Sequence, residues 1–148
     1  MKEELQNKLA ENFPFMIGRN VFTGKIIYDK NGKTSGVYCE CHDGWFQLIY
    51  DCCKEIKESY EKNGYDITID TIMPFQIKEK YGTLNMYFNC SEEAHNIVSK
   101  YEDMSETVCE FCGDTGILRN MNGWYKTLCE NCYIEKNKIY WQIKFSMI

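Results

Sequence analysis

The chain has 148 residues, of which 44% are hydrophobic and 26% charged, and its formal net charge is −5. This length suits one domain, or one domain with a small appendage, and it allows a real hydrophobic core. The acidic balance excludes a broad phosphate-binding surface of the histone type. No apolar run approaches the roughly 20 residues that a membrane-spanning helix needs, so no membrane association is expected.

The chain contains nine cysteines, which is far above the usual share. Such a number indicates either a disulfide framework or metal ligands, and the redox compartment decides between them. The first residues, Met1–Ala10, contain no apolar stretch of the kind found in a secretory signal. We therefore expect a cytoplasmic protein with reduced thiols, whose cysteines are zinc ligands or small buried side chains.

The predicted elements begin with a short polar helix over residues 1–12. A hairpin is expected over residues 24–39, with its turn at Asn31 and Gly32. This dipeptide is preferred in tight hairpin turns because both residues tolerate a positive φ.

The clearest helix is predicted over residues 44–63. Apolar side chains recur there at spacings of four, three, four and four and share one face: Trp45, Ile49, Cys52, Ile56 and Tyr60. Gly64 is a suitable end for this helix, because glycine readily adopts the left-handed conformation that closes a helix.

Strands follow in the next segment. Apolar and polar residues alternate over 65–70, and two further strands are expected over 75–81 and 83–88, joined at Gly82. A second helix is expected to begin after Ser91, a good N-terminal cap, and its apolar stripe consists of Ala94, Ile97, Val98 and Tyr101. These elements predict an α+β fold, with a small, mostly antiparallel sheet packed by two or three helices.

Two Cys-x-x-Cys pairs are the strongest chemical signal in the chain. Cys109 and Cys112 form the first pair, Cys129 and Cys132 the second, and sixteen residues separate them. Each pair places two sulfurs on one side of a tight turn, and two such turns complete a tetrahedron around Zn²⁺. Four thiolates leave no position for water or substrate, so the sequence predicts one structural zinc ion.

The segment between the pairs fits one hairpin over residues 116–128, with its tip at 120–123. A short helix over 130–136 is expected to follow. This order is typical of a treble-clef finger, and a zinc ribbon is the alternative. The alternation over 139–147 predicts a final strand, although Ile134, Trp141, Phe145 and Ile148 would equally form a helical stripe.

The expected organisation is therefore an α+β domain over residues 1–108, followed by a zinc finger with a C-terminal strand packed on it over 109–148. The remaining cysteines fit buried packing positions. A second metal site remains open as an alternative, with ligands from Cys39, Cys41, His42 and either Cys52 or Cys53.

Glu79 falls on the apolar face of its predicted strand. A buried carboxylate must be paired or hydrogen-bonded, so Glu79 either ends the strand beside a basic side chain such as Arg19, which we favour, or marks a binding site. The candidate binding residues are Lys78, Glu79, Lys80, Tyr81, Arg119 and Trp124. Exposed aromatic side chains can stack on bases, but more often they fill the core.

Several segments, in this order, resemble a family of small uncharacterised bacteriophage and prophage proteins: Gly44–Phe46, Gln76–Leu84 running into Phe88, Cys109–Gly113 and Gly123–Cys129. The likeness covers roughly residues 41–132. In that family the second pair often ends in histidine, and Cys132 preserves four ligands here. The resemblance implies a phage or mobile-element origin and a zinc finger, and it implies no established activity.

We expect a non-enzymatic, zinc-stabilised protein that binds and inhibits or redirects a host factor, in the manner of anti-defence proteins such as anti-CRISPR proteins. The partner would be a host protein such as a defence nuclease, because an acidic surface competes well for a basic nucleic-acid groove. The alternatives are a nucleic-acid-binding zinc-finger protein and a protein that sequesters a small ligand or nucleotide.

Overall fold

The computed structural model describes residues 1–147. Its helices are α1 (Glu3–Asn12), α2 (Phe46–Asn63), α3 (Glu92–Ser105) and α4 (Glu130–Ser146), with short 3₁₀ turns at Pro14–Met16 and Asp43–Trp45. Its strands are β1 (Cys39–Glu40), β2 (Met73–Lys80), β3 (Thr83–Asn89), β4 (Ile117–Met121) and β5 (Trp124–Leu128). The fold is α+β, as the sequence predicts. We call residues 1–108 the body and residues 109–147 the finger.

Helix α2 is the central element of the core. The five apolar residues that the helical spacing places on one face, Trp45, Ile49, Cys52, Ile56 and Tyr60, are all almost completely buried. Gly64 closes the helix in the left-handed conformation, with φ of 70°. The apolar stripe therefore determines both the helix and the direction in which it packs.

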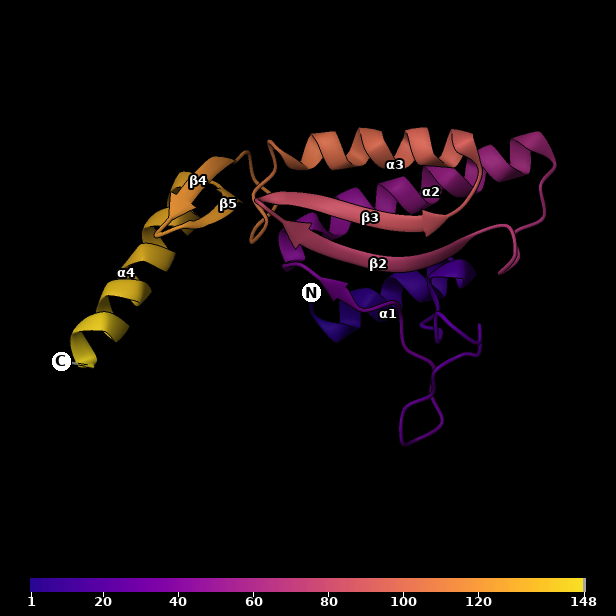
Figure 1. The fold of residues 1–148 in the computed structure, drawn as a ribbon, viewed down its shortest axis with the longest axis horizontal. Helices are drawn as coiled ribbons and strands as arrows, with labels where there is room; N and C mark the ends of the chain where they lie inside the picture. The colour runs from indigo at the N-terminus through magenta and orange to yellow at the C-terminus, as the bar shows by residue number, and fades with distance from the viewer. Residues whose placement is uncertain (148) are drawn as a thin grey trace.

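The body sheet has the strand order β1-β2-β3. Strands β2 and β3 form an antiparallel hairpin, whereas the short strand β1 lies parallel to β2, with Cys39 opposite Ile77. Helices α2 and α3 pack together across one face of this sheet (Figure 1). Ser91 caps α3 as predicted, since its hydroxyl accepts a hydrogen bond from the backbone N–H of Ala94.

In the body, two of the predicted strand regions do not form continuous strands. Residues 65–70 form a loop, which the Thr71 hydroxyl closes by donating to the Asp66 carbonyl (2.6 Å) and accepting from the Thr68 N–H (2.9 Å). The predicted strand there is wrong, because local side-chain hydrogen bonds compete with sheet pairing. The second region is the hairpin predicted over residues 24–39. Its turn at Asn31 and Gly32 is confirmed, but the segments on the two sides of the turn are joined by only one bridge, Tyr28–Thr34.

The predicted C-terminal strand over 139–147 is also wrong, because residues 139–146 continue helix α4 and Met147 lies in the turn that follows it. Cys129 caps the helix, and its sulfur accepts from the Cys132 N–H (3.4 Å). Helix α4 projects away from the body (Figure 1), and none of its described residues is buried. Alternation needs a sheet with one buried face, and no such sheet lies along this segment.

None of the helices formed by residues 1–147 combines the length and the apolar character needed to cross a membrane.

The start of α2 packs directly on the first cysteine turn of the finger. The Gly44 N–H donates to the Glu110 carbonyl (2.8 Å), and the Trp45 indole N–H donates to the Val108 carbonyl (2.8 Å). A methyl group on Gly44 would overlap the backbone of Cys109, Glu110 and Gly113. Gly44 is therefore required by close backbone contact between body and finger.

We expect Gly44→Ala to lower the free energy of unfolding by about 3 kcal/mol or more, because the added methyl group meets rigid backbone rather than a movable side chain. Urea unfolding measures this change. Gly32→Ala is the control, since its methyl group would meet open space. That change should cost only the backbone penalty of about 1 kcal/mol. Equal losses in the two variants would contradict the close contact at Gly44.

Candidate metal centre and its junction with the body

The two Cys-x-x-Cys pairs meet in space at the base of the finger. Cys109 and Cys112 lie in the turn after α3, Cys129 follows β5, and Cys132 lies in the first turn of α4. The four sulfurs all lie within 4.8 Å of one another. These four cysteines form a site that can hold a metal ion, as the spacing predicts.

The geometry of the sulfurs fits a tetrahedral ion. Metal–sulfur bonds of about 2.3 Å, the length found for Zn²⁺, place neighbouring sulfurs about 3.8 Å apart. The sulfurs of Cys112 and Cys129 lie 3.6 Å apart. A bound cation would therefore need little rearrangement of the chain.

The thiols also favour a cation chemically. Burial raises the pKa of Cys109, but hydrogen bonds from the backbone N–H groups of Cys129, Cys112 and Phe111 outweigh it and lower the pKa to about 7. Burial, together with hydrogen bonds to neighbouring sulfurs, raises the pKa of Cys112 to about 11. Four thiolates this close together repel one another, so the four thiols do not all ionise without a cation. A divalent cation compensates the negative charge and allows all four to bind as thiolates.

Residues 1–147 contain no second cluster of metal-ligating side chains. Cys39, Cys41 and Cys52 are buried in the core of the body. Burial raises the pKa of Cys39 and of Cys52 to about 12. These cysteines are neutral packing residues, and together with His42 they do not form the second metal site considered from the sequence.

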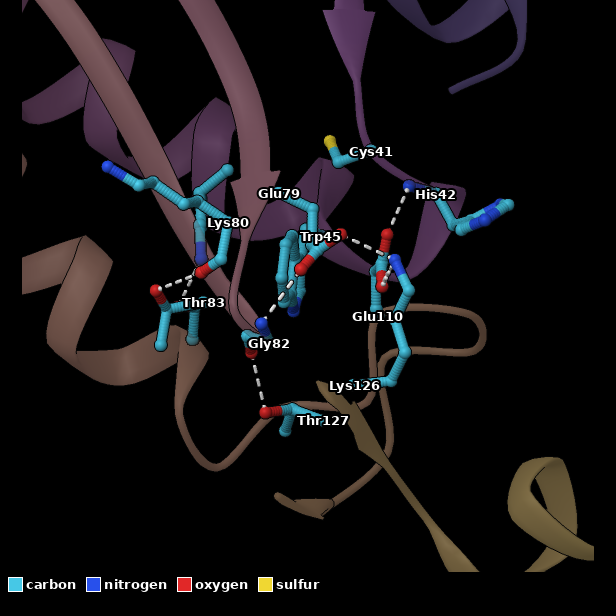
Figure 2. Close-up of polar contacts among 12 residues, drawn as sticks. Cys41, His42, Trp45, Glu79, Lys80, Gly82, Thr83, Glu110, Lys126 and Thr127 are labelled. Carbon is cyan, nitrogen blue, oxygen red and sulfur yellow. Dashed lines mark hydrogen bonds and ion pairs between the residues drawn. The ribbon is translucent and has the colours of Figure 1, made fainter. Parts of the chain in front are cut away.

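A buried ion cluster joins the finger to the body. The Lys126 ammonium on β5 lies 2.6 Å from Oε2 of Glu79 on β2 and 3.1 Å from Oε2 of Glu110 in the first cysteine turn (Figure 2). The exposed fractions of the three side chains are 22%, 19% and 1%. Burial lowers the pKa of Lys126, but the hydrogen bond that Lys126 donates to Glu79 and the charge of Glu110 outweigh it and raise the pKa.

Backbone groups complete this junction. Oε1 of Glu79 accepts from the Gly82 N–H (2.7 Å), and the Thr127 hydroxyl donates to the Gly82 carbonyl (2.7 Å; Figure 2). The His42 N–H donates to Oε1 of Glu110 (3.3 Å). Oε2 of Glu110 has no well-directed hydrogen-bond donor among the described residues, so the Lys126 charge is its main compensation.

Glu79 therefore pairs with a basic side chain near the end of its strand, as favoured from the sequence, but the expected partner was wrong. Arg19 donates instead to the Gly24 carbonyl (2.9 Å). Neither Glu110 nor Lys126 stands out in the sequence, because Lys126 lies 47 positions from Glu79. The one available signal was their place inside the segments that carry the phage-protein resemblance.

Four of the six candidate binding residues line one cleft of about 350 Å³ between the tips of the two hairpins. Its lining residues are Glu79, Lys80, Tyr81, Gly123, Trp124 and Tyr125. Tyr81 and Trp124 are 74% and 77% exposed. The structure thus brings together Trp124 and a segment that lies more than 40 positions earlier in the chain.

The other two candidate binding residues lie outside this cleft. The Arg119 guanidinium contacts Glu130 (2.7 Å) and lies 4.5 Å from the centroid of the Tyr133 ring. The Lys78 ammonium lies 5.9 Å from the centroid of the Tyr87 ring. Arg119 is held within the finger, so it is poorly placed to bind a phosphate.

The backbone at Tyr81 is strained. Tyr81 and Gly82 form the two-residue loop between β2 and β3, with φ values of 52° and 84°. Glycine, asparagine and aspartate suit such a loop, whereas a bulky side chain with positive φ costs on the order of 1 kcal/mol or more. Tyr81 has little burial to offset this cost.

Comparisons of the chain with protein-family models, with curated proteins and with solved structures give no match. The phage-protein resemblance therefore stays a prediction.

We expect Lys126→Met to lower the free energy of unfolding by about 3 kcal/mol, because it leaves two carboxylates without a counter-charge in a largely buried place. Adding Glu79→Gln and Glu110→Gln should recover part of that loss. Lys100→Met is the control, since the Lys100–Glu55 pair is exposed and contributes at most about 1 kcal/mol. Urea unfolding measures all three changes, and equal losses at Lys126 and Lys100 would contradict the proposed role of the junction.

Proposed function

We propose that the protein is a non-enzymatic, zinc-stabilised binding protein of phage or mobile-element origin, which acts in the host cytoplasm. It binds a host protein such as a defence nuclease in a stoichiometric complex, and thereby inhibits or redirects it, as anti-CRISPR and other anti-defence proteins do. The observation that carries this proposal is the exposed aromatic cleft, in which a strained backbone presents Tyr81 beside Trp124.

Zinc is the metal that this ligand set favours. Four thiolates in tetrahedral geometry are typical of structural zinc sites, whereas oxygen ligands are typical of magnesium and calcium sites. With all four positions taken by protein sulfur, the ion has no open position for a substrate. Its role is to hold the finger together, and this role agrees with a binding function rather than a catalytic one.

The cleft has the composition of a binding hot spot. Tyr81 and Trp124 are large, exposed and held on two adjacent hairpins, and such aromatic side chains dominate the energy of many protein interfaces. The Lys80 ammonium lies 5.8 Å from the centroid of the Tyr81 ring. A conformational cost at an exposed residue indicates a functional rather than a packing role.

The overall charge agrees with a basic partner surface. The formal charge of the chain is −5 before the metal site is counted. Four thiolates and one Zn²⁺ would add two further negative charges. An acidic protein of this kind is attracted to the basic groove in which a nuclease holds nucleic acid, and it repels nucleic acid itself.

We expect the purified protein to contain one zinc ion per chain and to lose the order of its finger when a strong chelator removes the ion, because metal binding supplies folding free energy. Metal analysis and hydrogen exchange over residues 109–147 measure these two effects. Cys112→Ser should abolish stoichiometric zinc, whereas Cys90→Ser, outside the four-cysteine cluster, should not. A fully ordered finger in the chelated protein would contradict the structural role.

We expect Tyr81→Asn and Trp124→Ala each to weaken the partner contact about 30-fold or more. Tyr81→Asn should at the same time stabilise the free protein, because asparagine suits the left-handed turn. The measurement is protection of a restricted phage in cells that carry a nuclease-based defence, with Phe22→Ala, a 94% exposed residue outside the cleft, as the control. The proposal fails if the protein gives no protection, or if all the variants protect equally.

The cleft also fits a second candidate function, the sequestration of a small planar ligand. Its volume of about 350 Å³ lies at the lower end of the range for small-molecule sites. Aromatic walls beside Lys80 would suit a nucleotide. Nucleotide-induced rises in melting temperature that disappear in Trp124→Ala would favour this function over protein binding.

A further inference from the structure

The polar contacts between the body and the finger are confined to the neighbourhood of the metal ligands. Outside the continuous segment 107–116, every hydrogen bond or ion pair from the body to the described part of the finger ends on one of three residues: Glu110, Lys126 and Thr127 (Figure 2). The first lies between Cys109 and Cys112, and the other two lie directly before Leu128 and Cys129. The residues that dock the finger on the body therefore belong to the chain segments that hold the sulfurs in place.

Hydrogen bonds connect the two cysteine turns with the body in one continuous series. The Glu110 carbonyl accepts from the Gly44 N–H of the body (2.8 Å), and the Glu110 N–H donates to the Thr127 carbonyl on β5 (3.0 Å). The Thr127 hydroxyl in turn donates to the Gly82 carbonyl of the body (2.7 Å). This series forms only when both cysteine turns have their final positions, and a bound metal ion fixes those positions.

The two walls of the aromatic cleft depend on the same contacts. Tyr81 directly precedes Gly82, whereas Trp124 and Tyr125 directly precede Lys126. The ion pair of Lys126 with Glu79 and the hydrogen bond from the Thr127 hydroxyl join the β2–β3 hairpin to the β4–β5 hairpin. Among the described residues no other hydrogen bond or ion pair joins these two hairpins. Release of the cysteine turns would therefore separate the walls of the cleft.

The core of the body does not use the finger. Its cluster of buried side chains runs from Leu9 to Tyr101 and includes none of the described residues of the finger. Within the described finger, only Cys109 and Leu128 are buried apolar residues. A segment with so small an apolar core depends on its metal ion for folding. The body, in contrast, has what it needs to stay folded when the metal is removed.

We propose that metal loading and docking of the finger on the body are one coupled step. The cleft between Tyr81 and Trp124 then exists only in the metal-loaded protein, and the body contributes to the affinity for the metal. Glu79 is a positioning residue in this step, because it is not one of the ligands and acts through Lys126. The inference rests on the proposed function only for the use of the cleft, since the coupling needs no partner.

Thermodynamic linkage makes the coupling measurable from either side. The factor by which the metal favours docking is also the factor by which docking favours the metal. If the unloaded finger does not dock, a weaker junction in the loaded protein appears in full as a weaker affinity for the metal. A finger whose affinity is set by its four cysteines alone would not respond to a change in the body.

The first test measures the affinity of the full chain for zinc by competition with a chelator of known affinity. Glu79→Gln keeps an oxygen that can accept from the Gly82 N–H, but it removes the charge that faces Lys126. We expect this variant to bind zinc about 10-fold more weakly than the wild type. Glu55→Gln is the matched control, since it removes a carboxylate from an exposed ion pair within the body, and it should bind zinc like the wild type.

Thr127→Val gives a second measurement with the same expectation, because it removes the hydroxyl that donates to the Gly82 carbonyl. Circular dichroism of the zinc-loaded variants checks that they are folded. Wild-type zinc affinity in both Glu79→Gln and Thr127→Val would overturn the proposal. Equal weakening in Glu79→Gln and Glu55→Gln would overturn it as well, because the effect would then come from the body in general and not from the junction.

The second test follows hydrogen exchange of single amides after a strong chelator has removed the metal from the wild type. The Gly44 N–H, which lies 65 positions before Cys109, should exchange about 100-fold faster, because its acceptor is the Glu110 carbonyl. The Ile56 N–H within α2 should stay protected. Unchanged protection of Gly44 would overturn the proposal. Loss of protection at Ile56 would also overturn it, since the body would then unfold with the finger.

Neither test uses the host partner, so this inference and the proposed function can fail separately. A protein that shows the coupling but gives no protection to a phage contradicts the proposed function alone. A protein that protects the phage but keeps its zinc affinity in Glu79→Gln and Thr127→Val contradicts the coupling alone.

Discussion

The position of the finger on the body depends on one interaction, the pair of ion pairs that the Lys126 ammonium forms with Glu79 and Glu110. Its three side chains come from the body hairpin, the first cysteine turn and the finger hairpin. An ammonium and two carboxylates can leave water only as a group, because each alone would be an uncompensated charge. The finger is therefore held in one position on the body.

The metal centre and this junction stabilise the finger in two different ways. The four cysteines close the finger on itself, whereas Lys126 and the contacts of Gly44 and Trp45 attach it to the body. Because the finger is closed on itself and also attached to the body, it forms a rigid unit with the body. It holds Trp124 beside Tyr81 and directs α4 outward, away from the core.

Two features of the chain are unfavourable for its stability, and both lie at the margins of the finger. Tyr81 has a backbone conformation that suits smaller residues, and α4 exposes apolar side chains over most of its surface. Neither departure is compensated by packing within residues 1–147. Such departures are expected where a surface binds something else, and the one at Tyr81 supports the proposed function.

The sequence by itself determined the elements whose signal is local. The stripe on residues 44–63 defines a helix, because it repeats at the helical period. The cysteine spacing defines the metal site, because each Cys-x-x-Cys turn places two sulfurs on one side. Tertiary structure alone decided that Lys126 rather than Arg19 pairs with Glu79, since that partner is distant in sequence. It also decided that residues 139–146 are helical, because their alternation favours a strand only where a sheet can receive it.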